Sequence, residues 1–64
     1  MNKLDEALKN ICLALRQVPN DLSLLDNFAS ILVMLGNKDH AKEVYKKLLS
    51  IKPREIWKKK LLNL

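Results

Sequence analysis

The chain has 64 residues, one cysteine, one histidine and a formal net charge of +5. At this length, a single domain buries only about 60% of the surface that its unfolded chain exposes, so the core is marginal. The lone Cys12 excludes an internal disulfide and fits a reducing compartment. No stretch approaches the roughly 18 apolar residues of a membrane span, and the polar N-terminus does not resemble a signal peptide. We expect a soluble, cytoplasmic protein that does not bind a membrane.

The first expected helix follows an apolar stripe with three- and four-residue steps, which is typical of one helical face. The stripe consists of Leu4, Leu8, Ile11, Leu15 and Val18. Pro19 ends this helix, because proline has no N–H and its ring clashes with the preceding turn. Asn20 or Asp21 is then expected to cap the second helix by accepting a backbone N–H.

The second expected helix extends from that cap to Gly36, which suits the left-handed residue that closes a helix. Its apolar residues are Leu24, Leu25, Phe28, Ala29, Ile31, Leu32 and Leu35. The set contains one small residue, Ala29, and one aromatic residue, Phe28. We expect Ala29 to allow a close helix crossing and Phe28 to fill a gap.

Asn37 is expected to cap a third helix, and Asp39 places negative charge in its first turn, where the helix dipole favours it. Pro53 ends this helix and opens a fourth. The apolar positions of these two helices are Ala41, Val44, Tyr45, Leu48, Leu49 and Ile51, followed by Ile56, Trp57, Leu61, Leu62 and Leu64. Because the turns are short, neighbouring helices must run roughly antiparallel. The sequence therefore predicts an all-α fold of about four helices arranged as stacked hairpins.

Several residues recur at a spacing of 34, and a period in the range of roughly 20–50 marks a chain that stacks copies of one unit. The identical pairs are Asp5 and Asp39, Ala7 and Ala41, Leu15 and Leu49, and Pro19 and Pro53. The conservative pairs are Asp21 and Glu55, Leu22 and Ile56, and Phe28 and Leu62.

The segment from Leu25 to Pro53 resembles a tetratricopeptide repeat, a helix–turn–helix unit with a W-x2-L-G-x2-Y, A-x3-F, P pattern. Gly36 takes the turn, and Ala41 takes the place of the family alanine. Tyr45 takes the aromatic place, whereas leucines fill the tryptophan and tyrosine places. The resemblance implies one domain over residues 1–64, made of a half repeat (1–20), a full repeat (21–53) and a terminal helix (54–64).

In this family, the first helices of the repeats line a concave groove that holds peptides or helices. The resemblance therefore implies a non-enzymatic module that binds a protein, a peptide or a second copy of itself. The implied groove residues are Ser23, Asp26, Asn27, Ser30, Val33, Met34, Trp57, Lys60, Leu61 and Leu64. Asn27 stands where many members have an asparagine that bonds the ligand backbone, whereas Trp57 is also expected to pack inward with Leu61 and Leu64.

Charge is uneven along the chain, with three basic and four acidic side chains in residues 1–32 but nine basic and three acidic ones in residues 33–64. The basic cluster at the last helix consists of Lys52, Arg54, Lys58, Lys59 and Lys60. Such a cluster is typical of a solvated outer face, and it also leaves open an acidic partner or nucleic-acid phosphates. The half–whole–half order of repeats further leaves open a designed or truncated scaffold without a natural ligand.

Nothing in the sequence predicts catalysis, a metal site or a cofactor. Cys12 lies on an apolar helix, where an uncharged thiol is expected to pack as a small hydrophobe. His40 is expected to be a solvated residue in the first turn of its helix. A four-helix chain of this size is also expected to have little room for a pocket of a few hundred Å³.

Overall fold

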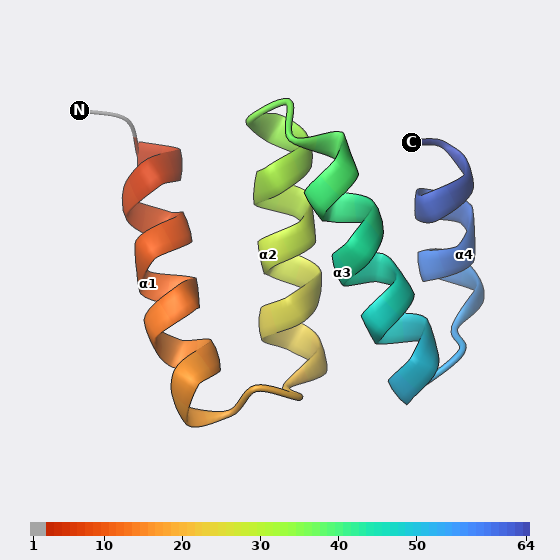
Figure 1. The fold of residues 1–64 in the computed structure, drawn as a ribbon, viewed down its shortest axis with the longest axis horizontal. Helices are drawn as coiled ribbons and strands as arrows, with labels where there is room; N and C mark the ends of the chain where they lie inside the picture. Colours follow the sequence, from red (N-terminus) through yellow and green to blue (C-terminus); the bar gives the residue numbers. More distant parts are fainter. Residues whose placement is uncertain (1–2) are drawn as a thin grey trace.

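The computed structural model describes residues 3–64, which form four α-helices and no strand. The first two residues of the expected half repeat lie outside the described part. The helices are α1 (Lys3–Gln17), α2 (Leu22–Met34), α3 (Lys38–Ile51) and α4 (Glu55–Leu62). They follow one another across the molecule, and successive helices run antiparallel (Figure 1). The predicted all-α fold of four helices is confirmed.

Helix α2 begins and ends at the signals that the sequence contains. The Oδ1 of Asp21 accepts the Leu24 N–H at 3.0 Å, which satisfies a backbone donor that the helix leaves free. At the other end Gly36 has a φ of 82°. Its N–H donates to the Val33 carbonyl at 3.0 Å, and the next N–H, of Asn37, donates to Leu32 at 2.8 Å. These two bonds form a Schellman motif, in which glycine occupies the left-handed position.

Pro19 and Pro53 end α1 and α3, respectively, because each proline restricts the backbone of the residue before it. A residue before proline is pushed away from helical backbone angles. Lys52, which precedes Pro53, is accordingly extended, with φ of −149° and ψ of 112°. In the same way α1 ends at Gln17, so that Val18 lies outside the helix and is exposed. The prediction that Val18 continues the apolar stripe of the first helix is therefore wrong.

The core lies among α2, α3 and α4. Its buried residues are Leu25, Ala29, Leu32, Ala41, Val44, Tyr45, Leu48 and Trp57. Ala29 and Ala41 have no exposed surface, as expected for small residues at the crossing of α2 and α3. Trp57 is 3% exposed. The guanidinium carbon of Arg54 lies 5.3 Å from the centroid of the Trp57 ring. Trp57 therefore anchors the short α4 to the rest of the molecule.

Helix α1 is the least buried of the first three helices, because it packs only on α2 and contributes no buried residue. Leu8 and Leu15 are partly buried against the core. Cys12 is exposed rather than packed as a small hydrophobe, since it lies on the outer face of the helix. No helix within residues 3–64 combines the length and the apolar character needed to cross a membrane.

Candidate functional site

A groove lies between α2 and α4, with a volume of about 400 Å³ and an open mouth. We call it the α2–α4 groove. Its lining residues are Ser30, Val33, Met34, Tyr45, Lys60, Asn63 and Leu64. Its volume falls within the range of roughly 300–1,000 Å³ that is usual for ligand sites. Three helices contribute to it, so its shape depends on how α4 docks onto α2 and α3.

The apolar part of the α2–α4 groove comes from the end of α2 and from Leu64, which lies two residues beyond the end of α4. Met34 is 67% exposed, whereas Val33 and Leu64 are partly buried. Methionine is flexible and polarisable, so it adapts to ligands of different shape. This wall can receive an apolar side chain from a partner.

The polar part of the α2–α4 groove consists of Ser30, Tyr45 and Asn63. Within residues 3–64, their side chains make no hydrogen bond. Tyr45 is 2% exposed, yet the described residues include no sealed polar side-chain atom that lacks a partner. The Tyr45 hydroxyl therefore keeps contact with the groove. These hydroxyl and amide groups can both donate and accept hydrogen bonds, as a peptide backbone requires.

Lys60 and Asp26 join the two sides of the α2–α4 groove. The Lys60 Nζ lies 3.3 Å from Asp26 Oδ1, and both side chains are about one-third exposed. The ion pair connects α2 directly to α4. It also compensates the lysine charge, which makes the groove less attractive to a bare anion.

The structure brings together part of the set of candidate residues. Those that line the α2–α4 groove are Ser30, Val33, Met34, Lys60 and Leu64, and Asp26 joins them through its ion pair with Lys60. Ser23 and Asn27 are exposed on α2 but do not line the groove. Leu61 is partly buried against the core, and Trp57 is buried in it. An exposed binding role for Trp57 is therefore wrong, because its ring is occupied by core packing.

The sequence interpretation missed Tyr45 and Asn63 as groove residues. Tyr45 was expected only in the core, although a tyrosine combines an apolar ring with a hydroxyl that needs a partner or water. The hydroxyl group of Tyr45 was therefore the feature of the sequence from which its place in the groove could have been predicted. The place of Asn63 in the groove could not be predicted from the sequence, because it depends on the residue at which α4 ends.

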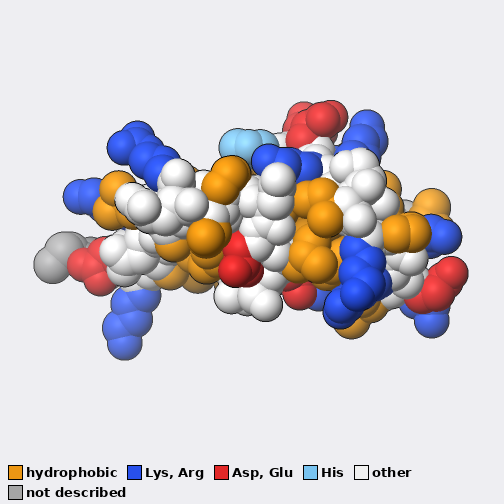
Figure 2. Space-filling view, turned by 90° about the horizontal axis from the view of Figure 1, so that it is seen from below, with side chains coloured by type: hydrophobic (Ala, Val, Ile, Leu, Met, Phe, Trp, Pro, Cys, Tyr) orange, Lys and Arg blue, Asp and Glu red, His pale blue; other side chains and the backbone are white. Residues whose placement is uncertain are grey.

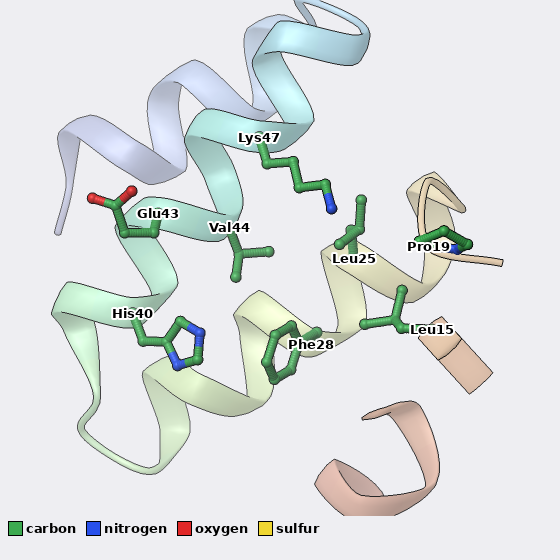
Figure 3. A pocket seen from close by; sticks show the side chains of 8 residues that line it. All are labelled: Leu15, Pro19, Leu25, Phe28, His40, Glu43, Val44 and Lys47. Carbon is green, nitrogen blue, oxygen red and sulfur yellow. The ribbon is translucent and has the colours of Figure 1, made fainter. Parts of the chain in front are cut away.

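A second groove lies among α1, α2 and α3, with a volume of about 310 Å³. We call it the α1–α2–α3 groove. Its lining residues are Leu15, Pro19, Leu25, Phe28, His40, Glu43, Val44 and Lys47. Figure 3 shows Leu15, Leu25 and Phe28 facing one hollow, with the Lys47 side chain extending from α3 toward Leu25.

Two expectations fail at the α1–α2–α3 groove. His40 is exposed but not simply solvated, because its ring packs edge-on against Phe28 at 5.4 Å between centroids and 82° between planes. The chain also has more room for grooves than its size suggested. The extra room arises because α1 and α3 both pack on α2 without packing on each other.

The basic cluster of the last helix is partly compensated by other groups. Lys60 is paired with Asp26, and Lys58 lies 3.8 Å from Glu55. Arg54 lies over the ring of Trp57. Figure 2 shows blue Lys and Arg side chains separated by hydrophobic and acidic ones on the viewed face, rather than a continuous basic surface. A polyanion would find Lys52 and Lys59 without an ion-pair partner among residues 3–64.

Neither a protein-family model, nor a curated protein, nor a solved structure matches this chain. The candidate site therefore rests on its own geometry and on the sequence pattern.

Proposed function

We propose that this protein is a small helical-repeat module of the tetratricopeptide type, which binds an extended peptide segment of another protein in the α2–α4 groove. The observation that supports this function best is the content of the groove. An exposed methionine and two other apolar residues lie beside three polar side chains that make no hydrogen bond within residues 3–64. The 34-residue period supports the repeat type.

Binding in this groove divides into an apolar and a polar part. One apolar side chain of the peptide packs against Val33, Met34 and Leu64. The peptide backbone exchanges hydrogen bonds with Ser30, Tyr45 and Asn63. The hydrogen bonds orient the peptide, whereas burial of the apolar side chain supplies most of the affinity, since about 25 cal/mol is gained for each Å² of apolar surface removed from water.

The same proposal covers the organisation of the chain. Residues 1–20, 21–53 and 54–64 act as a half repeat, a full repeat and a terminal helix of one domain. The module uses no cofactor and is not an enzyme. Its single cysteine, exposed on α1, fits a reducing compartment such as the cytoplasm.

The competing function is electrostatic binding of nucleic acid or another acidic surface. The nine basic side chains of residues 33–64 favour it. The pairing of Lys58 and Lys60 with carboxylates weakens it, because charges that are already compensated release fewer counterions on binding. A scaffold without a natural ligand would bind neither class of partner.

The test begins with peptides of about 12 residues selected from a random library on the wild-type chain. A selected peptide is then titrated into Met34→Glu, with Leu13→Glu as the matched control, because both residues are exposed and apolar but only Met34 lines the groove. We expect Met34→Glu to lower the affinity at least about tenfold and Leu13→Glu to change it less than about twofold. Equal losses in both variants would contradict the proposed groove.

Salt separates the two classes of partner. Peptide binding in the groove should change less than about threefold between roughly 0.1 and 0.5 M NaCl, and Lys58→Ser with Lys59→Ser should leave it nearly unchanged. If instead these lysine substitutions abolish binding to a single-stranded oligonucleotide and added salt lowers its affinity steeply, the partner is polyanionic.

A further inference from the structure

The outer face of α4 exposes two large apolar side chains. Ile56 is 54% exposed and Leu62 is 85% exposed. Lys59 lies between them at a spacing of three residues on either side, so the three side chains form a stripe along the helix. Trp57 and Leu61 face the core instead. Helix α4 is therefore apolar on two faces, of which one is covered.

The 34-residue period shows what covers the equivalent stripe elsewhere in the molecule. Ile56, Lys59 and Leu62 correspond to Leu22, Leu25 and Phe28 of α2. In α2 this stripe faces α3, since the Phe28 ring contacts His40 of α3. Leu25 and Phe28 also line the α1–α2–α3 groove together with four α3 residues, His40, Glu43, Val44 and Lys47. The exposed stripe of α4 thus corresponds to a stripe that a following helix covers.

The α3 face that covers the stripe of α2 has an equivalent face on α1. His40, Val44 and Lys47 of α3 correspond to Glu6, Asn10 and Leu13 of α1, and all three α1 residues are exposed. Leu13 is 49% exposed and is the large apolar residue among them. Helix α1 therefore presents to solvent the face that α3 directs toward α2.

Either α1 or α4 of a second copy could cover the exposed stripe of α4. The charges of these helices favour α1. The last turn of α4 contains Lys59 and Lys60, whereas the first turn of α1 contains Asp5 and Glu6. In an antiparallel pair these turns lie side by side, so opposite charges meet. In an antiparallel pair of two α4 helices, Lys58 and Lys59 near the middle of one helix would lie opposite Lys59 and Lys58 of the other, and like charges at close range oppose association.

We propose that two copies of this protein associate head to tail, with α4 of one copy docking antiparallel against α1 of the next. The intermolecular helix pair reproduces the relation between α2 and α3. By the same correspondence, Leu62 of one copy lies against Glu6 of the other, as Phe28 lies against His40. Leu13 packs against the aliphatic stem of Lys59 and against Ile56. This surface is separate from the α2–α4 groove, so self-association and peptide binding can fail independently.

The association is weak, because two buried positions of the α2–α3 contact are polar in the proposed interface. Leu25 is replaced by Lys59, and Val44 is replaced by Asn10. A head-to-tail contact is also heterologous, so it does not saturate at a dimer unless the copies close into a ring. We expect short oligomers that grow with concentration.

The experiment is sedimentation velocity from about 10 µM to about 1 mM, because interfaces below about 1,200 Å² are typically transient. We compare the wild type with Leu62→Glu, which alters the α4 face, and with Leu13→Glu, which alters the α1 face. Met34→Glu is the matched control, since it adds the same charge at an exposed apolar site outside the interface. Circular dichroism verifies that each variant keeps its helices.

We expect the mean mass of the wild type and of Met34→Glu to rise with concentration. Each interface variant alone should remain monomeric. An equimolar mixture of Leu62→Glu and Leu13→Glu should form a 1:1 dimer and nothing larger, because one intact α1 face and one intact α4 face remain. A wild type that stays monomeric throughout, interface variants that associate alone, or a mixture that stays monomeric would each overturn the proposal.

Discussion

The Lys60 ammonium lies 3.3 Å from the Asp26 carboxylate, and the two residues are 34 positions apart in the sequence. The ion pair therefore joins two positions that are related by the 34-residue period of the sequence. It spans the α2–α4 groove, where the two helices face each other through side chains. Its partial burial separates it from the two exposed pairs within α3 and α4, Lys46 with Glu43 and Lys58 with Glu55.

The coupling between Asp26 and Lys60 should be measurable in a double-mutant cycle with Asp26→Asn and Lys60→Met. Because both side chains remain about one-third exposed, we expect a coupling free energy of only about 0.5–1 kcal/mol, which should decrease with added salt. Urea denaturation followed by circular dichroism gives the four free energies of unfolding. A coupling of zero would show that the ion pair does not hold α4 onto α2.

Ala41→Leu should destabilise the fold by about 1–3 kcal/mol, because Ala41 has no exposed surface and a larger side chain overpacks its site. The matched control is Ala7→Leu at the equivalent position of α1, where the alanine is only partly buried. We expect the control to lose less than about half as much stability. Thermal denaturation compares them, and equal losses would contradict the assigned packing.

Gly36→Ala should destabilise the protein by about 1 kcal/mol, since its φ of 82° is strained for an L-residue with a side chain. No atom lies within 4 Å of the position that an added Cβ would take, so a clash does not contribute. Gly36→Asn should cost less than Gly36→Ala, because asparagine tolerates the left-handed region better. Urea denaturation ranks the two variants, and the reverse order would contradict a purely conformational cost.

Trp57→Ala should cost about 3–5 kcal/mol, which approaches the whole stability of a domain of this size. Trp57→Phe retains part of the packing, and we expect it to remain folded with a lower melting temperature. Fluorescence offers an independent check, since Trp57 is the single tryptophan. Its emission should shift to longer wavelength on unfolding, and an unchanged emission would contradict its burial.

The fold was more predictable from the sequence than the groove was. Pro19, Gly36 and Pro53 act through local backbone geometry, so the helix ends near them could be found without tertiary information. Apolar spacing alone could not distinguish Ile56 and Leu62 from Trp57 and Leu61, because only packing decides which face of α4 is covered.

The groove residues show the same division between local and tertiary information. Ser30, Met34, Lys60 and Leu64 were expected on one surface through the resemblance to a repeat family, and they do line one groove. Tyr45 enters that groove from α3, which the repeat pattern assigns to the other side. Its role depends on how deeply the ring packs, and that depth is a property of the whole core.

The function is tested most directly by nuclear magnetic resonance on isotope-labelled protein, titrated with the tightest peptide from the random library. The protein is kept at about 50 µM, where weak self-association contributes little. If the α2–α4 groove binds the peptide, the amide signals of Ser30, Met34 and Asn63 shift most. If the largest shifts fall on His40 and Lys47 of the α1–α2–α3 groove, or on Lys58 and Lys59, the proposed peptide site is wrong.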